Sequence, residues 1–519
     1  MGRLSSRYTL RGTLVADSAL HVGGYGPATT VDLVQVRDGL GRVVLPGTSL
    51  AGVIRHALLD DDPAWWGTHL SGGEDSDRDA VASAITVADA PAIGDATLAV
   101  RDGVGIDRAT GTAARRHLYT RDVVTAGTTF TFCLHIEVTD PARDRAAREQ
   151  AAAIYALLVA GITIGGAGTR GLGKIRLTDP VLRREDFTTA AGLFAALETG
   201  GEPVVAEPAA APHAILRITA AWRALGPVMS KVADAGTEAA AFPAVAQDAT
   251  GIRLLIPGSS VKGTLRAHAE RIVATLVDPP PPPPGLLDQL ACTAALPAIG
   301  ELFGAAGDVA SGNPGRRGLL SVRDITSTVV LPARQWRRLR SPSVGGKREQ
   351  GRRAFADAVA ALNAITEPQG LWFDIAARNA IDRWTGAAAD GALFTAVEPY
   401  AVGPHRETAW TALELELDIA RARRTQAPVD AMIALLVLVL RDFAEGWIPL
   451  GFGTTRGLGS VRADPTAIRF DYIGPPGNDD HLAALHGRTL REVLDDSTIA
   501  DPLEKAWHTI ISSADRPVR

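Results

Sequence analysis

The sequence predicts an α+β fold of the ferredoxin-like kind, used twice along one chain. Short motifs recur in the same order in the two halves of the sequence. Stretches in which apolar and polar residues alternate indicate half-buried strands, and longer apolar patterns indicate helices. Each half is therefore predicted to contain a strand, a glycine loop, a helix, an inserted hairpin, a strand, a helix, a glycine-rich loop and a strand. This order fits a sheet with helices on one face.

The clearest repeat is a glycine-rich loop. One copy, beginning at Gly165, is GGAGTRGLGKIRL, and the other, beginning at Gly451, is GFGTTRGLGSVRA. Glycine permits sharp turns and lets main-chain N–H groups approach a polyanion. Arg170, Lys174 and Arg456 add cations that suit phosphate. Two tight turns with incidental arginines are the alternative, but duplication with the arginine retained favours phosphate binding.

A second repeat joins a Pro-Gly pair to the start of a helix. The copies are LPGTSLAGVIRHAL, beginning at Leu45, and IPGSSVKGTLRAHA, beginning at Ile256. In each, a Ser or Thr can cap the first helical turn and an Arg lies on the turn that follows. Free N–H groups at a helix start beside basic side chains make a candidate phosphate site, and capping with a solvated arginine is the equal alternative. The candidate residues are Ser49, Arg55, Ser260, Lys262 and Arg266.

A third repeat, IDRATG at 106–111 and IDRWTG at 381–386, precedes a new strand in each half. The strands that follow, FTFCLHIEV and LELELDI, alternate as half-buried antiparallel strands do. The expected elements are strands at 8–16, 130–138 and 413–419 and helices at about 143–159 and 428–444.

The repeats divide the chain into domains. We expect a first domain at 1–197, a linker at 198–213 rich in Pro, Ala and Gly, a second domain at 214–478 and a C-terminal helical extension at 479–519. Insertions at about 277–301, which contains six consecutive prolines, and at 334–353 enlarge the second domain. The latter is basic, and Trp336 offers a stacking surface among its arginines. We therefore expect nucleic-acid contact through Arg337 and Arg338, with a solvated loop as the alternative.

Composition narrows the class of protein. A chain of 519 residues, 46% of them hydrophobic, is too long for one core and suggests two large domains or more. A formal net charge of −5 argues against a uniformly basic nucleic-acid binder, although a groove can still be basic. Cys133 and Cys292 are too few for a disulfide framework or a four-cysteine zinc site. No run of roughly 18 apolar residues and no signal-peptide core occur, so we expect a cytoplasmic protein without membrane contact.

Taken in order, these motifs resemble the RAMP superfamily of CRISPR-associated proteins, in particular the backbone subunits that line up along guide RNA in type III effector complexes. The resemblance rests on the two glycine-rich loops, the two Pro-Gly motifs, the paired IDRxTG segments and LHVGG near the start, and it covers both halves. The chain is similar to two such subunits fused in tandem.

The resemblance implies two modified RRM-like ferredoxin domains with inserted hairpin thumbs. Such domains hold guide RNA by its backbone, and the thumbs displace a base of the guide and target duplex at regular intervals. The thumb residues would be Ile106, Asp107, Arg108, Ile381, Asp382 and Arg383. The implied partners are guide CRISPR RNA, target RNA and other effector subunits.

The resemblance also implies a cleavage site. In target-cleaving members an aspartate between the first strand and the Pro-Gly motif supports metal-dependent scission of target RNA, and Asp32 has that position. We expect Asp32 to be catalytic and to hold Mg²⁺, or another divalent cation, jointly with RNA, because one carboxylate alone is a weak site. His21 is a further RNA-binding candidate, with packing or hydrogen bonding as the alternative.

The second domain departs from this pattern. The same count back from its Pro-Gly motif reaches Pro243, and no acid falls there. Asp234, in the same loop, is the reserve catalytic candidate. We therefore expect the first domain to cut and the second chiefly to bind. The alternatives are a non-catalytic RNA-binding scaffold and a guide-processing endoribonuclease of the same superfamily.

Overall fold

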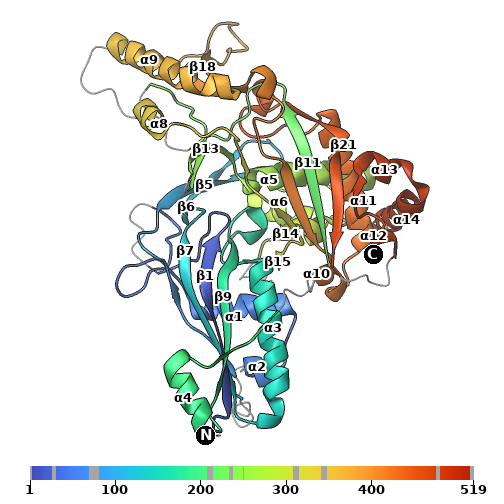
Figure 1. Ribbon diagram of the computed structural model, residues 1–519. Helices are drawn as coiled ribbons and strands as arrows, with labels where there is room; N and C mark the ends of the chain where they lie inside the picture. The colour runs from blue at the N-terminus through green and yellow to red at the C-terminus, as the bar shows by residue number, and fades with distance from the viewer. Residues whose placement is uncertain are drawn as a thin grey trace. The chain divides into compact units, whose positions relative to one another are not determined.

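The computed structural model describes residues 3–25, 31–68, 81–206, 214–232, 238–248, 250–307, 315–340, 348–474 and 480–514 (Figure 1). The chain divides into two compact units. Unit 1 comprises 1–101, 120–168 and 172–212, and unit 2 comprises 102–119, 169–171 and 213–519. The first hairpin tip and part of the first glycine-rich loop thus belong to unit 2. The segment predicted as a linker begins within α4 (Ala190–Thr199) and includes β10 (Glu202–Pro203).

Unit 1 is built on an antiparallel six-stranded sheet. Its strands run in the order β10-β9-β1-β7-β3, with β8 paired to β9. The central strand β1 (Ser6–Ala16) buries Tyr8, Leu10 and Leu14, as its alternation predicts. The other strands are β3 (Ile85–Val87), β7 (Thr129–Val138), β8 (Ile162–Thr163) and β9 (Lys174–Asp186).

Two helices complete the core of unit 1. The first, α1 (Gly47–Leu58), buries Leu50 and Ile54, and α3 (Asp144–Ala160) packs against β1, β7 and β9. The buried residues of α3 recur at three- and four-residue intervals, so they form one stripe that faces the sheet. These residues include Ala147, Ala151, Ile154 and Leu158.

Unit 2 repeats this plan with five strands in the order β16-β20-β11-β21-β22. Its central strand β11 (Ile215–Ala224) pairs with β20 (Leu413–Asp418) and β21 (Val461–Ile473), and both pairings are antiparallel. The edge strands are β16 (Leu320–Val322) and β22 (Arg488–Thr489).

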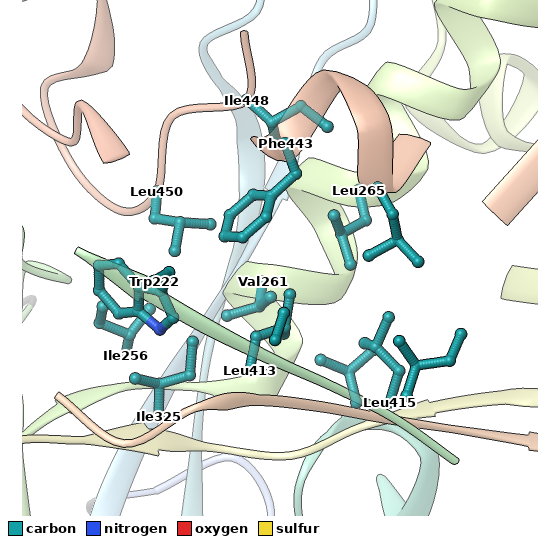
Figure 2. Packing of buried hydrophobic residues seen from close by; sticks show 14 of the residues in the cluster. Trp222, Ile256, Val261, Leu265, Ile325, Leu413, Leu415, Phe443, Ile448 and Leu450 are labelled. Atoms are coloured by element: carbon teal, nitrogen blue, oxygen red, sulfur yellow. The ribbon is translucent and has the colours of Figure 1, made fainter. Parts of the chain in front are cut away.

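The core of unit 2 lies between this sheet and its helices, which include α5 (Gly258–Val277) and α11 (Val429–Glu445). Figure 2 shows Val261 and Leu265 of α5 beside Leu413 of β20 and Phe443 of α11. The C-terminal extension also packs here, through α12 (Asp480–Ala483), α13 (Leu490–Asp495) and α14 (Ser497–Ala514).

The repeat extends to an irregularity in the backbone. The pairing of β1 with β9 shifts register between Arg11 and Thr13, and the pairing of β11 with β21 shifts between Ala220 and Trp222. A β-bulge bends and twists a strand locally, so both sheets are deformed at the corresponding point. The α+β prediction is confirmed, and the predicted strands and helices correspond to β1, β7, β20, α3 and α11 with slightly different ends.

The remaining elements lie between these. In unit 1 they are β2 (Val44–Leu45), α2 (Pro63–Trp66) and β4 (Ala90–Pro91). The first hairpin consists of β5 (Leu98–Ile106) and β6 (Ala113–Val124), and the second of β18 (Leu371–Arg378) and β19 (Phe394–Ala401). Unit 2 adds β12 (Val245–Asp248), β13 (Gly251–Ile256), α6 (Leu286–Ala294), α7 (Ile299–Phe303), β14 (Gly304–Ala305), β15 (Arg316–Arg317), β17 (Ile325–Thr326), α8 (Ala333–Arg340), α9 (Arg348–Thr366) and α10 (Ile419–Arg424). Among the described helices, none is both long and apolar enough to span a bilayer.

Candidate functional site

The backbone of each glycine-rich loop is hydrogen-bonded to the segment that follows the central strand of its sheet. In the first loop, the N–H of Gly166 donates to the carbonyl of His21 at 2.8 Å, and the N–H of Phe452 in the second loop donates to Met229 at 2.7 Å. A second matched pair of bonds runs from Gly173 to Ala19 and from Gly459 to Pro227, each at 2.8 Å. These N–H groups are therefore engaged within the protein and do not form an open anion cradle.

The glycines themselves are required by close packing. Gly165 has φ +79° and Gly451 has φ +87°. A Cβ added at Gly165 would lie 2.1 Å from the His21 carbonyl oxygen, and one at Gly451 would lie 2.2 Å from that of Met229. No side chain fits there. The part of each loop that can contact a ligand is the exposed turn that carries Arg170 or Arg456.

In unit 2 two aromatic rings lie beside the turn that carries Arg456. The Arg456 guanidinium lies 5.3 Å from the centroid of Phe452 and 5.6 Å from that of Phe394. Lys231 lies 5.7 Å from the Phe452 centroid. Two exposed cations thus share half-buried rings, an arrangement that suits both the phosphates and the bases of a single strand. Lys231, Phe394 and Phe452 were not among the predicted site residues, although the Phe within GFGTTRG is a visible signal.

Arg170 belongs to unit 2, where it lies close to other cations. Lys262 on α5 is only 5% exposed, and its Nζ donates to the carbonyl of Leu320 at 2.6 Å. Burial, together with the nearby charges of Arg170, Arg266 and Arg317, lowers the pKa of Lys262 to about 7. Arg170 and Arg266 are thus close enough to Lys262 to act on its charge, a grouping that the sequence did not predict. Lys174 is half-buried at the start of β9.

The two Pro-Gly helices are capped by aspartates from distant segments. The predicted Ser or Thr cap is wrong, because the N-cap residues are Pro46 and Pro257 and neither helix has a side-chain cap bond from that residue. Instead, Oδ1 of Asp89 accepts from the N–H of Gly47 at 2.7 Å, and Oδ1 of Asp324 accepts from Gly258 at 2.8 Å. A carboxylate already placed at the helix start weakens the attraction for a second anion.

The other predicted residues of these helices lie as follows. Ser49 and Ser260 are half-buried in the first turns. Arg55 forms a 3.3 Å ion pair with the exposed Asp61. Arg266 is engaged by Glu270 at 2.6 Å and also donates to the carbonyl of Gly304 at 3.1 Å. Arg266 therefore stabilises unit 2 and has its donors largely occupied.

Asp32 is exposed at the base of the first hairpin. Its Oδ2 accepts from the N–H of Thr120 at 2.7 Å and from the hydroxyl of Thr120 at 3.0 Å. The backbone N–H of Asp32 donates to the same hydroxyl at 3.0 Å. These bonds lower the pKa of Asp32, so the carboxylate is ionised and held in one orientation at neutral pH.

His21 lies on the other side of the same β6 segment. Its Nδ1–H donates to the carbonyl of Asp122 at 2.7 Å, and the ring is 4% exposed. Burial lowers the pKa of His21, so the imidazole is neutral at pH 7. Asp32 and His21 are therefore assembled around residues 120–122, but His21 packs beneath Gly166 and offers no charge to a phosphate.

Unit 2 has the same backbone at this place and a different side chain. Leu33 bridges to Arg121 in parallel, and Ala241 bridges to Ala396 in the same way. The residue before each is Asp32 in unit 1 and Ala240 in unit 2, so a methyl group occupies the place of the carboxylate. The count to Pro243 is wrong, because Pro243 pairs with Lys231 as Gln35 pairs with Gly23. Asp234 lies outside the described residues.

The residues present do not by themselves fit a divalent cation. Asp32 supplies one carboxylate, one oxygen of which already accepts two hydrogen bonds. Across the described parts of the chain, no three His, Cys, Asp or Glu side chains converge as metal ligands do. An Mg²⁺ ion usually takes six oxygen ligands, so RNA and water would have to supply most of them.

The two repeats that contain these loops, helices and hairpins both match one protein family. A model of the RAMP superfamily matches residues 13–176 and 242–462, more than half of the chain. The chain belongs to the RAMP superfamily. It is therefore a CRISPR-associated RNA-binding protein in general terms, with one RAMP domain in each matched range. No curated protein matches the chain significantly.

Both RAMP domains carry their IDRxTG motif at a hairpin tip, 106–111 in the first (tip 1) and 381–386 in the second (tip 2). In each tip the aspartate Oδ1 accepts from the N–H groups two and three residues later, at 3.0 and 2.8 Å in tip 1 and at 2.7 and 3.0 Å in tip 2. Asp107 and Asp382 thus fold the turn. Ile106 ends β5, and Ile381 bridges to Ala388. Arg108 forms an ion pair with Glu270 of α5 at 2.8 Å, whereas Arg383 is exposed.

The basic insertion of the second RAMP domain contains α8. Trp336 is 3% exposed and lies 6.0 Å, centroid to centroid, from Phe373, so the predicted stacking surface is wrong. The physical reason is that Trp336 and Leu339, three residues apart, form the buried side of an amphipathic helix. Arg337 and Arg338 lie on its exposed side. Residues 341–347 of the insertion lie outside the described residues.

Proposed function

We propose that this RAMP protein is a backbone subunit of a type III CRISPR effector complex, which holds guide RNA and its target duplex and cleaves target RNA through its first domain. The observation that carries the cleavage proposal is the exposed, ionised Asp32, fixed by Thr120 at the base of the first hairpin. The matched position in the second domain is Ala240, so the second domain holds RNA without this carboxylate.

RNA holding is supported by what the loops leave exposed. Arg170 and Arg456 occupy matching turns, and the second is flanked by Phe394, Phe452 and Lys231. Arginine on aromatic rings binds phosphate and base faces regardless of sequence. A protein that must accept any guide sequence needs this kind of contact and leaves base reading to pairing.

Asp32 would act by charge and position. Its lowered pKa makes it a weak proton acceptor, so it is unsuited to serve as the general base. A fixed carboxylate can instead orient the strand so that a ribose 2′-hydroxyl attacks the adjacent 3′-phosphate in line. The 2′-oxygen loses its proton to water and forms a 2′,3′-cyclic phosphate, while the bond to the 5′-oxygen breaks and that oxygen takes a proton from water. The proposal includes a divalent cation bound jointly by Asp32 and RNA. This cation would stabilise the negative charge on the phosphate.

Replacement of Asp32 by Asn tests the proposal in the assembled complex. We expect Asp32→Asn to retain guide and target binding and to lower target cleavage by about 10²- to 10⁴-fold. The matched control is Asp38→Asn, which removes a carboxylate from the same connecting segment; the Asp38 carboxylate accepts from Leu40 N–H and from Arg42. Unchanged cleavage in Asp32→Asn would make the chain a non-catalytic scaffold. Cleavage of precursor guide RNA by the isolated protein would favour a guide-processing enzyme.

A further inference from the structure

Four polar side chains are hydrogen-bonded in series across one face of the unit 1 sheet. Cys133 and His135 of β7 are two residues apart, so they share the face that points away from the core. Sγ of Cys133 lies 3.3 Å from Nε2 of His135, and Nδ1 of His135 lies 3.0 Å from Oγ1 of Thr9 on β1. Thr9 in turn donates to Oε2 of Glu185 on β9 at 3.3 Å. A thiol, a base and the groups that orient the base are thus placed in order.

The direction of these hydrogen bonds follows from the charge of Glu185. Arg7 donates to both carboxylate oxygens of Glu185, at 2.6 and 3.1 Å, and holds its pKa low, so the carboxylate can only accept. The one hydroxyl proton of Thr9 is therefore donated to Glu185, and Thr9 must accept from Nδ1–H of His135. Burial lowers the pKa of His135, so the ring is neutral at pH 7 and carries no second proton. Nε2 is thus left as the acceptor for the thiol of Cys133.

The repeated fold does not require this pair. In unit 2 the corresponding position of β20 is Glu414, which lies opposite Thr219 of β11 as His135 lies opposite Thr9 of β1. The residue two positions before Glu414 is Ala412. Of the two sheets, only that of unit 1 therefore places a base beside a thiol.

A cation lies beside the thiol on the neighbouring strand. Arg11 of β1 is the register partner of Cys133, and its charge acts on His135. The Arg11 side chain is exposed, and within the described part of the chain it forms no ion pair. Cys133 itself is half-buried. An exposed guanidinium next to a thiol that has its own base suits a reagent that is electrophilic at sulfur and negatively charged.

We propose that Cys133 is a modification site, which forms a mixed disulfide with a small disulfide that carries carboxylates. Nε2 of His135 accepts the thiol proton as Sγ attacks one sulfur of the reagent. A new S–S bond forms at Sγ while the S–S bond of the reagent breaks, and the departing thiolate takes the proton from His135. Cys133 is oxidised, half of the reagent is reduced to a thiol, and Arg11 pairs with a carboxylate of the reagent. This inference does not depend on the proposed RNA cleavage.

A metal ion is the alternative ligand, because thiolate and imidazole both bind Zn²⁺. A structural zinc site takes four protein ligands. Among the residues that the structure describes, no three His, Cys, Asp or Glu side chains are grouped as metal ligands. Nδ1 of His135 and the Glu185 carboxylate are also engaged by Thr9 and Arg7. The site therefore fits a thiol reagent better than a metal.

Exchange with oxidised glutathione tests the inference, and Cys292 supplies a control within the same chain. Cys292 is exposed on α6. The full chain is incubated with oxidised glutathione at neutral pH, and peptide mass spectrometry follows the mixed disulfide at each cysteine. We expect Cys133 to react about tenfold faster than Cys292, or more, in spite of its lower exposure, and dithiothreitol to reverse the reaction. A rate at Cys133 that does not exceed the rate at Cys292 would overturn the inference.

Removal of the base gives the second measurement. His135→Asn keeps an N–H group that can donate to Thr9 but has no group in the place of Nε2. We expect the rate at Cys133 to fall by about tenfold or more and the rate at Cys292 to stay the same. An undiminished rate at Cys133 would show that His135 does not accept the thiol proton, and the proposed step would be wrong.

Charge reversal at Arg11 tests the class of reagent and leaves the hydrogen-bonded series intact, because Arg11 is exposed and lies outside it. With Arg11→Glu, exchange at Cys133 should slow about threefold or more with oxidised glutathione, which is anionic. It should become faster with cystamine, which is cationic. Altered folding or access would move both rates in the same direction. Rates that change together, or not at all, would contradict recognition of an anionic disulfide.

Discussion

The two units share a backbone at the base of their hairpins, but only the first has a carboxylate beside the matched threonine. Thr120 and Thr395 occupy the same position, and the residues beside them are Asp32 and Ala240. The bonds that seat the glycine-rich loops also recur with nearly equal lengths. The difference teaches that the RNA-holding framework is a property of the repeated backbone, whereas the proposed chemistry is confined to a single carboxylate.

The most direct test of this difference is to move the carboxylate from the first domain to the second. We expect Ala240→Asp, introduced together with Asp32→Asn, to cleave target RNA at a new position, because Thr395 is present to orient the new side chain as Thr120 orients Asp32. The gain over Asp32→Asn alone should be tenfold or more. Denaturing gels of end-labelled target read both the rate and the position of the cut.

The matched control for this gain is Ala239→Asp in the same background. Ala239 is a buried residue next to Ala240, so a carboxylate there tests whether any nearby acid suffices. If the Ala240→Asp protein binds target but makes no new cut, the two units differ by more than the carboxylate. Met229, which stands where unit 1 has His21, would then be the next residue to exchange.

A second test asks whether the glycine-rich loops are equally indispensable. Gly165→Ala and Gly451→Ala each place a methyl group against a carbonyl oxygen at a positive φ. Each should lower the free energy of unfolding by about 3 kcal/mol, from backbone strain and overpacking together. Chemical denaturation of the full chain measures both changes.

The control is the pair Gly52→Ala and Gly263→Ala, which lie at matched places inside α1 and α5. An added Cβ at either meets nothing within 4 Å. Alanine has the higher helix propensity, so these changes should raise the free energy of unfolding by about 0.5 to 1 kcal/mol. Loss of stability at Gly165 but not at Gly451 would show that the two loops are not structurally equivalent.

Local sequence patterns predicted the main strands and helices, but they did not predict contacts between residues far apart in the sequence. The alternation in β1 and the apolar spacing in α3 were sufficient, because each element buries its own periodic face. The helix caps were not predictable in this way, since Asp89 and Asp324 reach Gly47 and Gly258 from segments far along the chain.

The candidate site shows the same division. Asp32 could be selected through the resemblance to the RAMP superfamily, but its partner Thr120 comes from the inserted hairpin and has no local signal. The match in unit 2 was miscounted because the β12–β13 hairpin lengthens the path to the Pro-Gly motif. Trp336 was the avoidable error, since its spacing from Leu339 already indicates a buried helical side.

The smallest expected effect concerns Lys262, whose matched residue in α1 is Ala51. Because the folded-state pKa of Lys262 is about 7 and the unfolded value is 10.5, the unfolded chain holds a proton in this interval that the folded chain has released. Unfolding free energy should therefore rise with pH between about 7 and 10, with a slope of up to about 1 kcal/mol per pH unit. Below pH 7 the cost of burying the charge is fully present. Lys262→Met removes this slope, although it also leaves the Leu320 carbonyl without its donor.

The exposed Lys231 provides the control, since Lys231→Met removes a lysine without emptying a buried site. The comparison is made by thermal unfolding of wild type and both variants from pH 6 to pH 10. The wild-type and Lys231→Met curves should run parallel, and the Lys262→Met curve should be flatter. Three parallel curves would mean that Lys262 stays charged in the folded protein. The cation cluster with Arg170 would then hold its full charge before any RNA binds, and the two Pro-Gly helices would differ more in electrostatics than in stability.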